Sequence, residues 1–181
     1  MIRGMLALGL ALVCSNLVQA QSQGIDGREA PEWGVTQWHQ LPDGKESLDL
    51  SDFEGKTVYL YCFQSWCPGC HSRGFPTLKA VADHYAGDDK VAFVAVQTVF
   101  EGFSTNTFAK AKAVAEKFEL SIPIGHTAGN QQNHTPELMR NYRTGGTPWT
   151  VIIDPDGQVR FNGFHITEED AIQLIDALKV P

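Results

Sequence analysis

Positive charge is scarce in this 181-residue chain, which has 14 lysine and arginine residues against 21 acidic ones and a net charge of −7. The basic residues form no patch, so we expect no nucleic-acid partner. The chain also lacks internal repeats and low-complexity runs. Its hydrophobic content of 43% is ordinary for a globular protein, and its length indicates one domain with additional segments.

No apolar run is long enough to span a bilayer. The longest, residues 5–13, falls well short of the roughly 20 residues that a membrane-spanning helix needs. It follows Arg3 and precedes the sequence VQA at 18–20, an arrangement typical of a cleaved secretory signal. We therefore predict a signal peptide over residues 1–20 and a periplasmic or otherwise exported protein. A lipid-modified Cys14 and an N-terminal helix that stays attached are the alternatives.

Cysteine is also scarce, and only Cys62, Cys67 and Cys70 remain after the predicted cleavage. Cys67 and Cys70 are separated by Pro68 and Gly69. A zinc site normally needs a second pair of ligands at similar spacing, and the sequence has none. The pair therefore favours redox chemistry over a metal site or a purely structural disulfide.

A helical pattern starts directly after Cys67, so we expect its sulfur at the N-terminus of a helix. Free backbone N–H groups and the helix dipole favour a thiolate there. Cys70, one turn further on, can attack a mixed disulfide formed on Cys67, and we assign both as catalytic. Cys62 lies in the apolar run 58–63. We interpret it as a buried core thiol, with a regulatory third thiol as the alternative.

The apolar patterns follow the order of an α/β fold with a central mixed sheet flanked by helices. Residues 35–38 and 48–50 predict an N-terminal β-hairpin, and residues 21–32 a flexible lead-in before a domain over 33–181. The other predicted elements are strands at 57–63, 91–96, 149–153 and 158–161, and helices at 68–85, 108–118, 136–142 and 171–178. Residues 125–135 are predicted to be a surface loop. A helix is thus inserted between a strand–helix–strand half and a hairpin–helix half.

Three separated motifs carry a resemblance to a known family. They are SWCPGC at 65–70 with Pro76 in the following helix, LSDFEGK at 50–56, and GTPWTVIIDPDG at 146–157. With the order of the elements, they resemble the thioredoxin fold and, more narrowly, the exported TlpA/ResA-like thiol–disulfide oxidoreductases among the redoxins. The resemblance covers about residues 31–178.

The resemblance implies a cis peptide between Thr147 and Pro148 that faces the cysteine pair. The residues alone leave an ordinary trans proline at the start of an edge strand equally open. In this fold the backbone before the proline pairs with an extended segment of the substrate protein. We therefore expect Trp66, Thr147 and Pro148 to bind substrate. The resemblance also implies a monomer without cofactor, protein thiols or disulfides as substrates, and a membrane-bound electron donor.

Several positions depart from the family's pattern. Pro68 and Gly69 reverse the Gly–Pro order of thioredoxins, Tyr61 stands where thioredoxins have a buried acid, and the helix has one more residue before Pro76 than is usual. Trp149, rather than a carboxylate, follows the proline motif, which puts a haem-maturation role in doubt. Because the two residues between the cysteines add neither charge nor a side-chain donor, we expect a reductant.

His71 and Arg73 follow the pair and are candidates to modulate it, with a solvated surface location as the competing interpretation. A thiol peroxidase is a second function class, but Gln64 stands where peroxiredoxins have threonine. A copper-binding module is a third, for which the chain offers His126, His134 and His165. These histidines show no ligand spacing, so we predict no metal.

Overall fold

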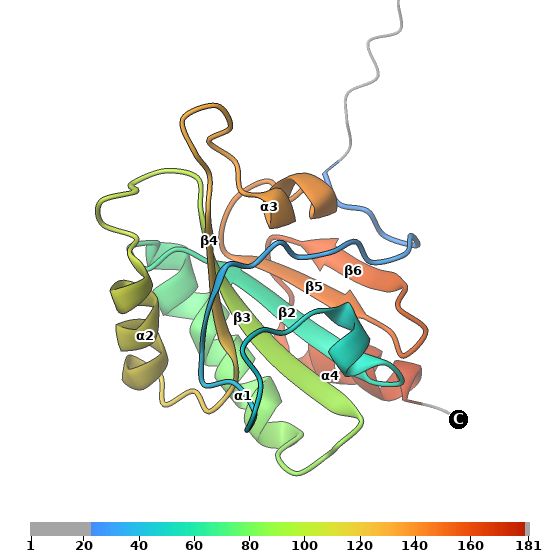
Figure 1. Ribbon diagram of the computed structural model, residues 1–181. Helices are drawn as coiled ribbons and strands as arrows, with labels where there is room; N and C mark the ends of the chain where they lie inside the picture. The colour runs from blue at the N-terminus through green and yellow to red at the C-terminus, as the bar shows by residue number, and fades with distance from the viewer. Residues whose placement is uncertain (1–22, 180–181) are drawn as a thin grey trace, which may run out of the picture.

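The computed structural model describes residues 23–179, so the predicted signal peptide lies outside the described residues. Its centre is a mixed sheet with the strand order β1-β4-β3-β2-β5-β6 (Figure 1). The strands are β1 (Gln37–His39), β2 (Thr57–Phe63), β3 (Val91–Val99), β4 (Ile124–Ala128), β5 (Trp149–Ile153) and β6 (Val159–Gly163). The strands β2, β3 and β4 are mutually parallel, whereas β1, β5 and β6 pair antiparallel with their neighbours.

The helices confirm the predicted order. They are α1 (Phe75–His84), α2 (Phe108–Lys117), α3 (Glu137–Tyr142) and α4 (Glu168–Leu178). The units β2–α1–β3 and β5–β6–α4 form the two halves, and α2, β4 and α3 lie between them in the chain. Within residues 23–179, no helix has both the length and the apolar character needed to cross a membrane.

All residues of β2 are buried, which is typical of a central strand covered on both faces. Alternation along the strand divides its side chains between two cores. Tyr59, Tyr61 and Phe63 pack in one core with residues of α1, α2 and α4. Val58, Leu60 and Cys62 pack in the other with residues of α3 and the N-terminal segment, which Figure 1 shows on the near side of the sheet.

The predicted N-terminal hairpin is wrong. Its first strand, β1, pairs antiparallel with β4, where Trp38 lies opposite Gly125. A Cβ atom at Gly125 would lie 2.9 Å from Val35 and 3.1 Å from Trp38, so glycine leaves room for both side chains. β4 also extends through Ala128 into the predicted loop and runs parallel to β3.

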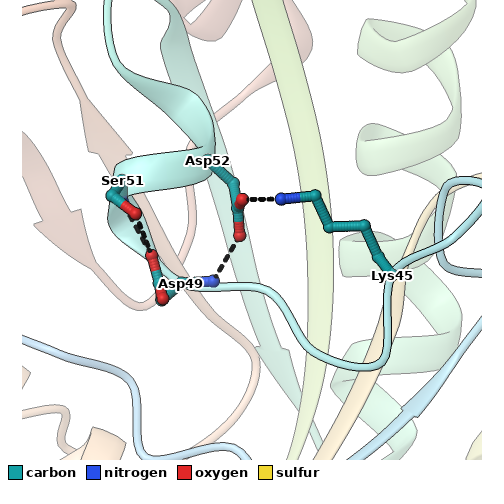
Figure 2. Close-up of polar contacts among 4 residues, drawn as sticks. All are labelled: Lys45, Asp49, Ser51 and Asp52. Atoms are coloured by element: carbon teal, nitrogen blue, oxygen red, sulfur yellow. Dashed lines mark hydrogen bonds and ion pairs between the residues drawn. The ribbon is translucent and has the colours of Figure 1, made fainter.

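The second predicted strand of the hairpin is a 3-10 helix, η1 (Leu50–Phe53). Figure 2 shows the Asp49 N–H donating to the Asp52 side chain at 2.9 Å and the Ser51 hydroxyl donating to the Asp49 side chain at 2.6 Å. The Ser51 N–H donates to the same Asp49 oxygen at 2.9 Å. This reciprocal capping favours a helical turn. Lys45 pairs with Asp52 and holds the pKa of that carboxyl below its usual range.

The described part of the predicted lead-in, residues 23–32, contacts the sheet. It runs beside β6, where the Gly27 N–H donates to the Val159 carbonyl at 2.7 Å. Ile25 and Ala30 are buried in the core on the α3 side. Backbone hydrogen bonds and two buried apolar side chains thus join this polar stretch to the sheet.

Candidate active site

The cysteine pair lies directly after β2. The strand ends at Phe63, and in the turn that follows the Cys67 N–H donates to the Gln64 carbonyl at 3.0 Å. Helical backbone begins at Pro68, and proline is well suited to a first helical position because it lacks the N–H that would be unpaired there. Cys67 therefore occupies the N-cap position, as the sequence predicts.

The helix is irregular before Pro76. Cys70–Gly74 forms a π-helical turn, closed by the Phe75 N–H donating to the Cys70 carbonyl. Regular α-helix follows, with Pro76 in its first turn. A π-turn holds one residue more than an α-turn, which accounts for the additional residue before the proline.

The sulfur of Cys67 forms hydrogen bonds with two backbone groups around it. The Cys70 backbone N–H donates to Cys67 Sγ at 3.3 Å. The Cys67 thiol in turn donates to the Thr147 carbonyl oxygen at 3.5 Å. The Cys67 side chain retains 6% exposure. The Cys70 N–H is therefore placed to stabilise negative charge that develops on the Cys67 sulfur during exchange.

Cys70 has a different environment, although Cys67, Cys70 and Cys62 are all free thiols here. Its side chain is 0% exposed. Burial, followed by hydrogen bonding with Cys67, raises the pKa of the Cys70 thiol to about 12, while the Gln64 backbone opposes this shift. The two thiols thus differ in exposure and in the backbone groups that contact them.

The peptide between Thr147 and Pro148 is cis, as the resemblance implies. A Cβ atom at Gly69 would lie 3.3 Å from Pro148 Cδ, so the proline ring packs against the residue before Cys70. Together with the Thr147 carbonyl beside Cys67, this contact confirms that the cis peptide faces the cysteine pair.

Two exposed aromatic side chains flank this arrangement. Trp66, directly before Cys67, is 49% exposed. Phe164 is also exposed and packs edge-on against Trp149, with ring centroids 4.6 Å apart. Trp66, which the sequence predicts to bind substrate, thus presents about half of its side chain to solvent next to Cys67.

In the described part of the chain, neither His71 nor Arg73 forms a hydrogen bond with either sulfur. His71 Nε2 lies 2.7 Å from the Ser65 carbonyl, and Lys117 Nζ lies 3.2 Å from His71 Nδ1. An acceptor at Nε2 and a donor at Nδ1 fit the neutral imidazole that carries its proton on Nε2. Arg73 is exposed. His71 therefore contacts Ser65 and Lys117 rather than the cysteine sulfurs, and Arg73 faces solvent.

A network of buried amide side chains holds the turn before Cys67, and sequence reasoning missed it. The Ser65 N–H donates to both Gln97 Oε1, at 3.1 Å, and Asn106 Oδ1, at 2.9 Å. Asn106 in turn donates to Gln64 Oε1 at 3.1 Å. The only sequence signal is the presence of glutamine within or directly after apolar strands.

The remaining candidates lie away from the pair. Cys62 is fully buried on the α3 side of the sheet, and burial raises the pKa of its thiol. His126 lies 3.0 Å from Gln97, and His134 lies against Phe103. Over residues 23–179, no three His, Cys, Asp or Glu side chains gather in a way that could hold a metal ion.

Comparison with known proteins places this site in a family. The chain matches the model of the AhpC/TSA family over residues 27–162. It is similar to the thiol-disulfide oxidoreductase ResA of Bacillus thuringiensis subsp. konkukian, with 26% identity over 84% of this chain and 77% of the relative. It is similar to ResA of Geobacillus kaustophilus at 29% identity, over 72% of this chain and 67% of that protein.

Solved structures agree. A crystal structure of a thioredoxin-like superfamily protein has 30% identity and a TM-score of 0.77, covering 84% of this chain and 97% of the other. A thiol-disulfide isomerase from Corynebacterium glutamicum has 27% identity and a TM-score of 0.71, with the same coverage. These likenesses confirm the thioredoxin fold. The chain therefore belongs to the AhpC/TSA family and is a thiol–disulfide oxidoreductase of the thioredoxin type.

Proposed function

We propose that this enzyme reduces disulfide bonds in protein substrates outside the cytoplasm, with Cys67 as the attacking sulfur and Cys70 as the resolving sulfur. The observation that supports these roles is the contrast between the two thiols. Cys67 keeps 6% exposure and accepts a backbone N–H, whereas Cys70 is 0% exposed with a raised pKa. The sulfur that attacks the substrate must be the one that the substrate can reach.

The reaction balances within the pair and the substrate. The Cys67 thiolate attacks one sulfur of the substrate disulfide, whose other sulfur leaves as a thiolate and takes a proton from water. Cys70 then loses its proton to solvent and attacks Cys67 Sγ, which releases the second substrate sulfur. The substrate gains two electrons and the enzyme keeps the Cys67–Cys70 disulfide.

We infer that substrate docks along the cis-proline. The Thr147 carbonyl lies beside Cys67 and the Pro148 ring lies against Gly69. An extended substrate segment next to Thr147 would therefore bring its disulfide to Cys67. Exposed Trp66 offers apolar surface for the same segment.

Export and electron supply complete the proposal. The signal peptide over residues 1–20 directs the chain out of the cytoplasm, and cleavage leaves Gln21 as the first residue. A membrane-bound donor returns the disulfide to the dithiol, and the enzyme acts as a monomer. Mass spectrometry of protein from the cell envelope should give Gln21 as the N-terminus. An intact Met1 form or a lipid-modified Cys14 would contradict this processing.

The proposed activity is tested with oxidised insulin as the protein disulfide. Excess reduced enzyme should lose two thiols, at Cys67 and Cys70, for each insulin disulfide that it opens, as counted by alkylation and mass spectrometry. Cys67→Ser should lose this activity. Reduction of insulin by Cys67→Ser at the wild-type rate would refute the assignment.

The AhpC/TSA match keeps a thiol peroxidase as a second candidate. Its first step would be oxidation of the Cys67 thiolate by peroxide to a sulfenic acid, followed by condensation with Cys70 and loss of water. Peroxide consumption by the reduced enzyme, at a rate above that of insulin reduction, would favour the peroxidase.

A further inference from the structure

The hydroxyl of Tyr61 is buried and has no hydrogen-bond partner among the described residues. Its side chain is 1% exposed and projects from β2 into the core that also contains Cys70. The ring is held by aromatic neighbours, with Phe75 edge-on at 5.1 Å and Phe63 stacked at 6.2 Å between centroids. A fixed polar group without a partner in a protein interior calls for an explanation.

The space for this hydroxyl comes from Gly74. A Cβ atom at Gly74 would lie 1.9 Å from the Tyr61 hydroxyl oxygen and 2.7 Å from the ring carbon that carries it. Gly74 has ordinary helical angles, φ −61° and ψ −51°, so its backbone does not require glycine. Its small size is what allows the hydroxyl to reach the helix backbone.

The same short segment holds Cys70. Gly74 ends the π-helical turn that starts at Cys70, so the hydroxyl enters the helix at the turn that carries the resolving sulfur. Turns of this kind occur frequently at functional sites. Tyr61 and Cys70 lie in the same buried cluster, and the hydroxyl meets the helix within one turn of Cys70, although it makes no hydrogen bond there with a described residue in the dithiol state.

The chemistry of Cys70 gives the hydroxyl a purpose. To resolve a mixed disulfide, Cys70 must become a thiolate in a site from which water is excluded, which is costly without a donor. Burial raises the pKa of Tyr61 far above its usual range, so the phenol keeps its proton and serves only as a donor. Two other titratable groups, Tyr59 and Cys67, affect the pKa of Tyr61, and Cys67 also affects the pKa of Cys70. On the other face of the sheet, negative charge on Cys70 would raise the pKa of Cys62.

We propose that Tyr61 is the hydrogen-bond donor to the Cys70 thiolate in the resolving step, and that Gly74 is there to admit its hydroxyl. This role rests on the proposed exchange between Cys67 and Cys70. In the step, Cys70 gives its proton to solvent, and the Tyr61 O–H then points to the anionic sulfur. The Cys70 Sγ–Cys67 Sγ bond forms as the Cys67–substrate S–S bond breaks, and the substrate sulfur leaves with the electron pair.

The test follows the two steps separately in rapid mixing of the reduced enzyme with 5,5′-dithiobis(2-nitrobenzoic acid). Attack by Cys67 releases a first nitrothiobenzoate in a concentration-dependent phase. Attack by Cys70 on the resulting mixed disulfide releases a second one in a concentration-independent phase. The probe is small, so substrate docking does not enter either rate.

Tyr61→Phe removes only the hydroxyl. We expect its first phase to keep the wild-type rate and its second phase to slow about tenfold or more, since hydrogen bonds to charged groups are the strong ones. The pH profile of the second phase should move to higher pH, which a merely structural change would not produce. Unfolding in urea should show Tyr61→Phe to be at least as stable as the wild type, because the hydroxyl has no partner in the dithiol state.

Tyr59→Phe is the matched control. Tyr59 is buried in the same strand and core, but its hydroxyl lies 3.5 Å from Thr150 Oγ1. It should change neither phase. Equal second phases in Tyr61→Phe and wild type at every pH would overturn the role of Tyr61 alone. A wild-type enzyme that releases only one nitrothiobenzoate would overturn the Cys67–Cys70 exchange itself.

Discussion

The backbone N–H of Cys70 points at the sulfur of Cys67 from 3.3 Å, so each cysteine serves the other in a different way. In the proposed exchange, Cys70 contributes its main chain to the first step and its side chain to the second. This division is possible because Cys67 caps the helix while Cys70 begins the π-helical turn. The pair is therefore asymmetric before any substrate arrives.

The first prediction follows from this asymmetry. Cys70→Ser should accumulate mixed disulfides between Cys67 and substrate proteins, because the attacking sulfur remains and nothing resolves its product. Cys67→Ser should accumulate few, because Cys70 is fully buried. Non-reducing electrophoresis of extracts after acid quenching measures the adducts. More adducts on Cys67→Ser than on Cys70→Ser would reverse the assignment.

The second prediction concerns Cys62, whose side chain lies in the core on the other side of the sheet from the pair. Cys62→Ala should leave both phases of thiol exchange unchanged. It should lower the free energy of unfolding by about 1–2 kcal/mol, since it removes a buried side-chain atom from a packed core. Unfolding in urea and rapid mixing measure the two effects. Lost exchange with an unchanged unfolding curve would show that Cys62 takes part.

The pattern of β2, the cysteine spacing and the Thr147–Pro148 motif could be read from the sequence because each is a local signal. The partner of β1 could not. Its pairing with β4 depends on Gly125 leaving room for Trp38, a contact between residues far apart in the chain. Two alternating leucines at 48 and 50 also suit a strand, and only the capping by Asp49 favours the 3-10 helix.

The candidate site was likewise predictable only in part from the sequence. Cys67, Cys70 and the cis-proline meet as expected because the cysteines follow the end of β2 and Pro148 precedes β5, which pairs antiparallel with β2. The amides of Gln97 and Asn106 were not predictable, since a buried polar side chain has no periodic pattern. The contact between Tyr61 and Gly74 depends on a π-helical turn, whose presence the sequence suggests only by its additional residue.

The third prediction concerns the stability of Gly74→Ala, in which helix propensity and packing have opposite effects. Alanine suits the helical angles and would be favoured by about 1 kcal/mol on propensity alone. Its Cβ would lie 1.9 Å from the Tyr61 hydroxyl, so the ring or the turn must move. We expect Gly74→Ala to be destabilised by about 1–3 kcal/mol in urea unfolding. Ser72→Ala, at an exposed position in the same turn, is the control and should be nearly neutral.

The fourth prediction is a loss of stability in alkali for the dithiol form. Burial raises the pKa of Cys70 to about 12 and also raises that of Cys62, whereas unfolded cysteine titrates at about 8.5. Above that pH the unfolded chain loses protons that the folded chain keeps, so the free energy of unfolding falls as pH rises. The contribution is complete below about pH 8 and is lost progressively toward pH 12.

Each buried thiol should contribute up to about 1.4 kcal/mol per pH unit in this window. Urea unfolding under reductant between pH 7 and about pH 10, before tyrosine titrates, measures the slope. Cys70→Ala and Cys62→Ala should each reduce it. A slope unaffected by either substitution would assign the alkaline effect to other groups.

The last prediction is the direction of electron flow. A strongly oxidising pair needs a reduced form that is stabilised at the attacking thiolate, and the residues between these cysteines, Pro68 and Gly69, supply no charge for it. His71 does not supply it either, because its ring nitrogens face the Ser65 carbonyl and Lys117. Because the pKa of Cys70 is raised, a reduced form with both sulfurs ionised is unfavourable, and this further favours the Cys67–Cys70 disulfide. We therefore expect a potential nearer to about −270 mV, the value for thioredoxin, than to about −120 mV. Equilibration of the Cys67–Cys70 pair with glutathione buffers of known ratio, followed by alkylation and mass spectrometry, measures it. A value near −120 mV would make the enzyme an oxidant and overturn the proposed direction.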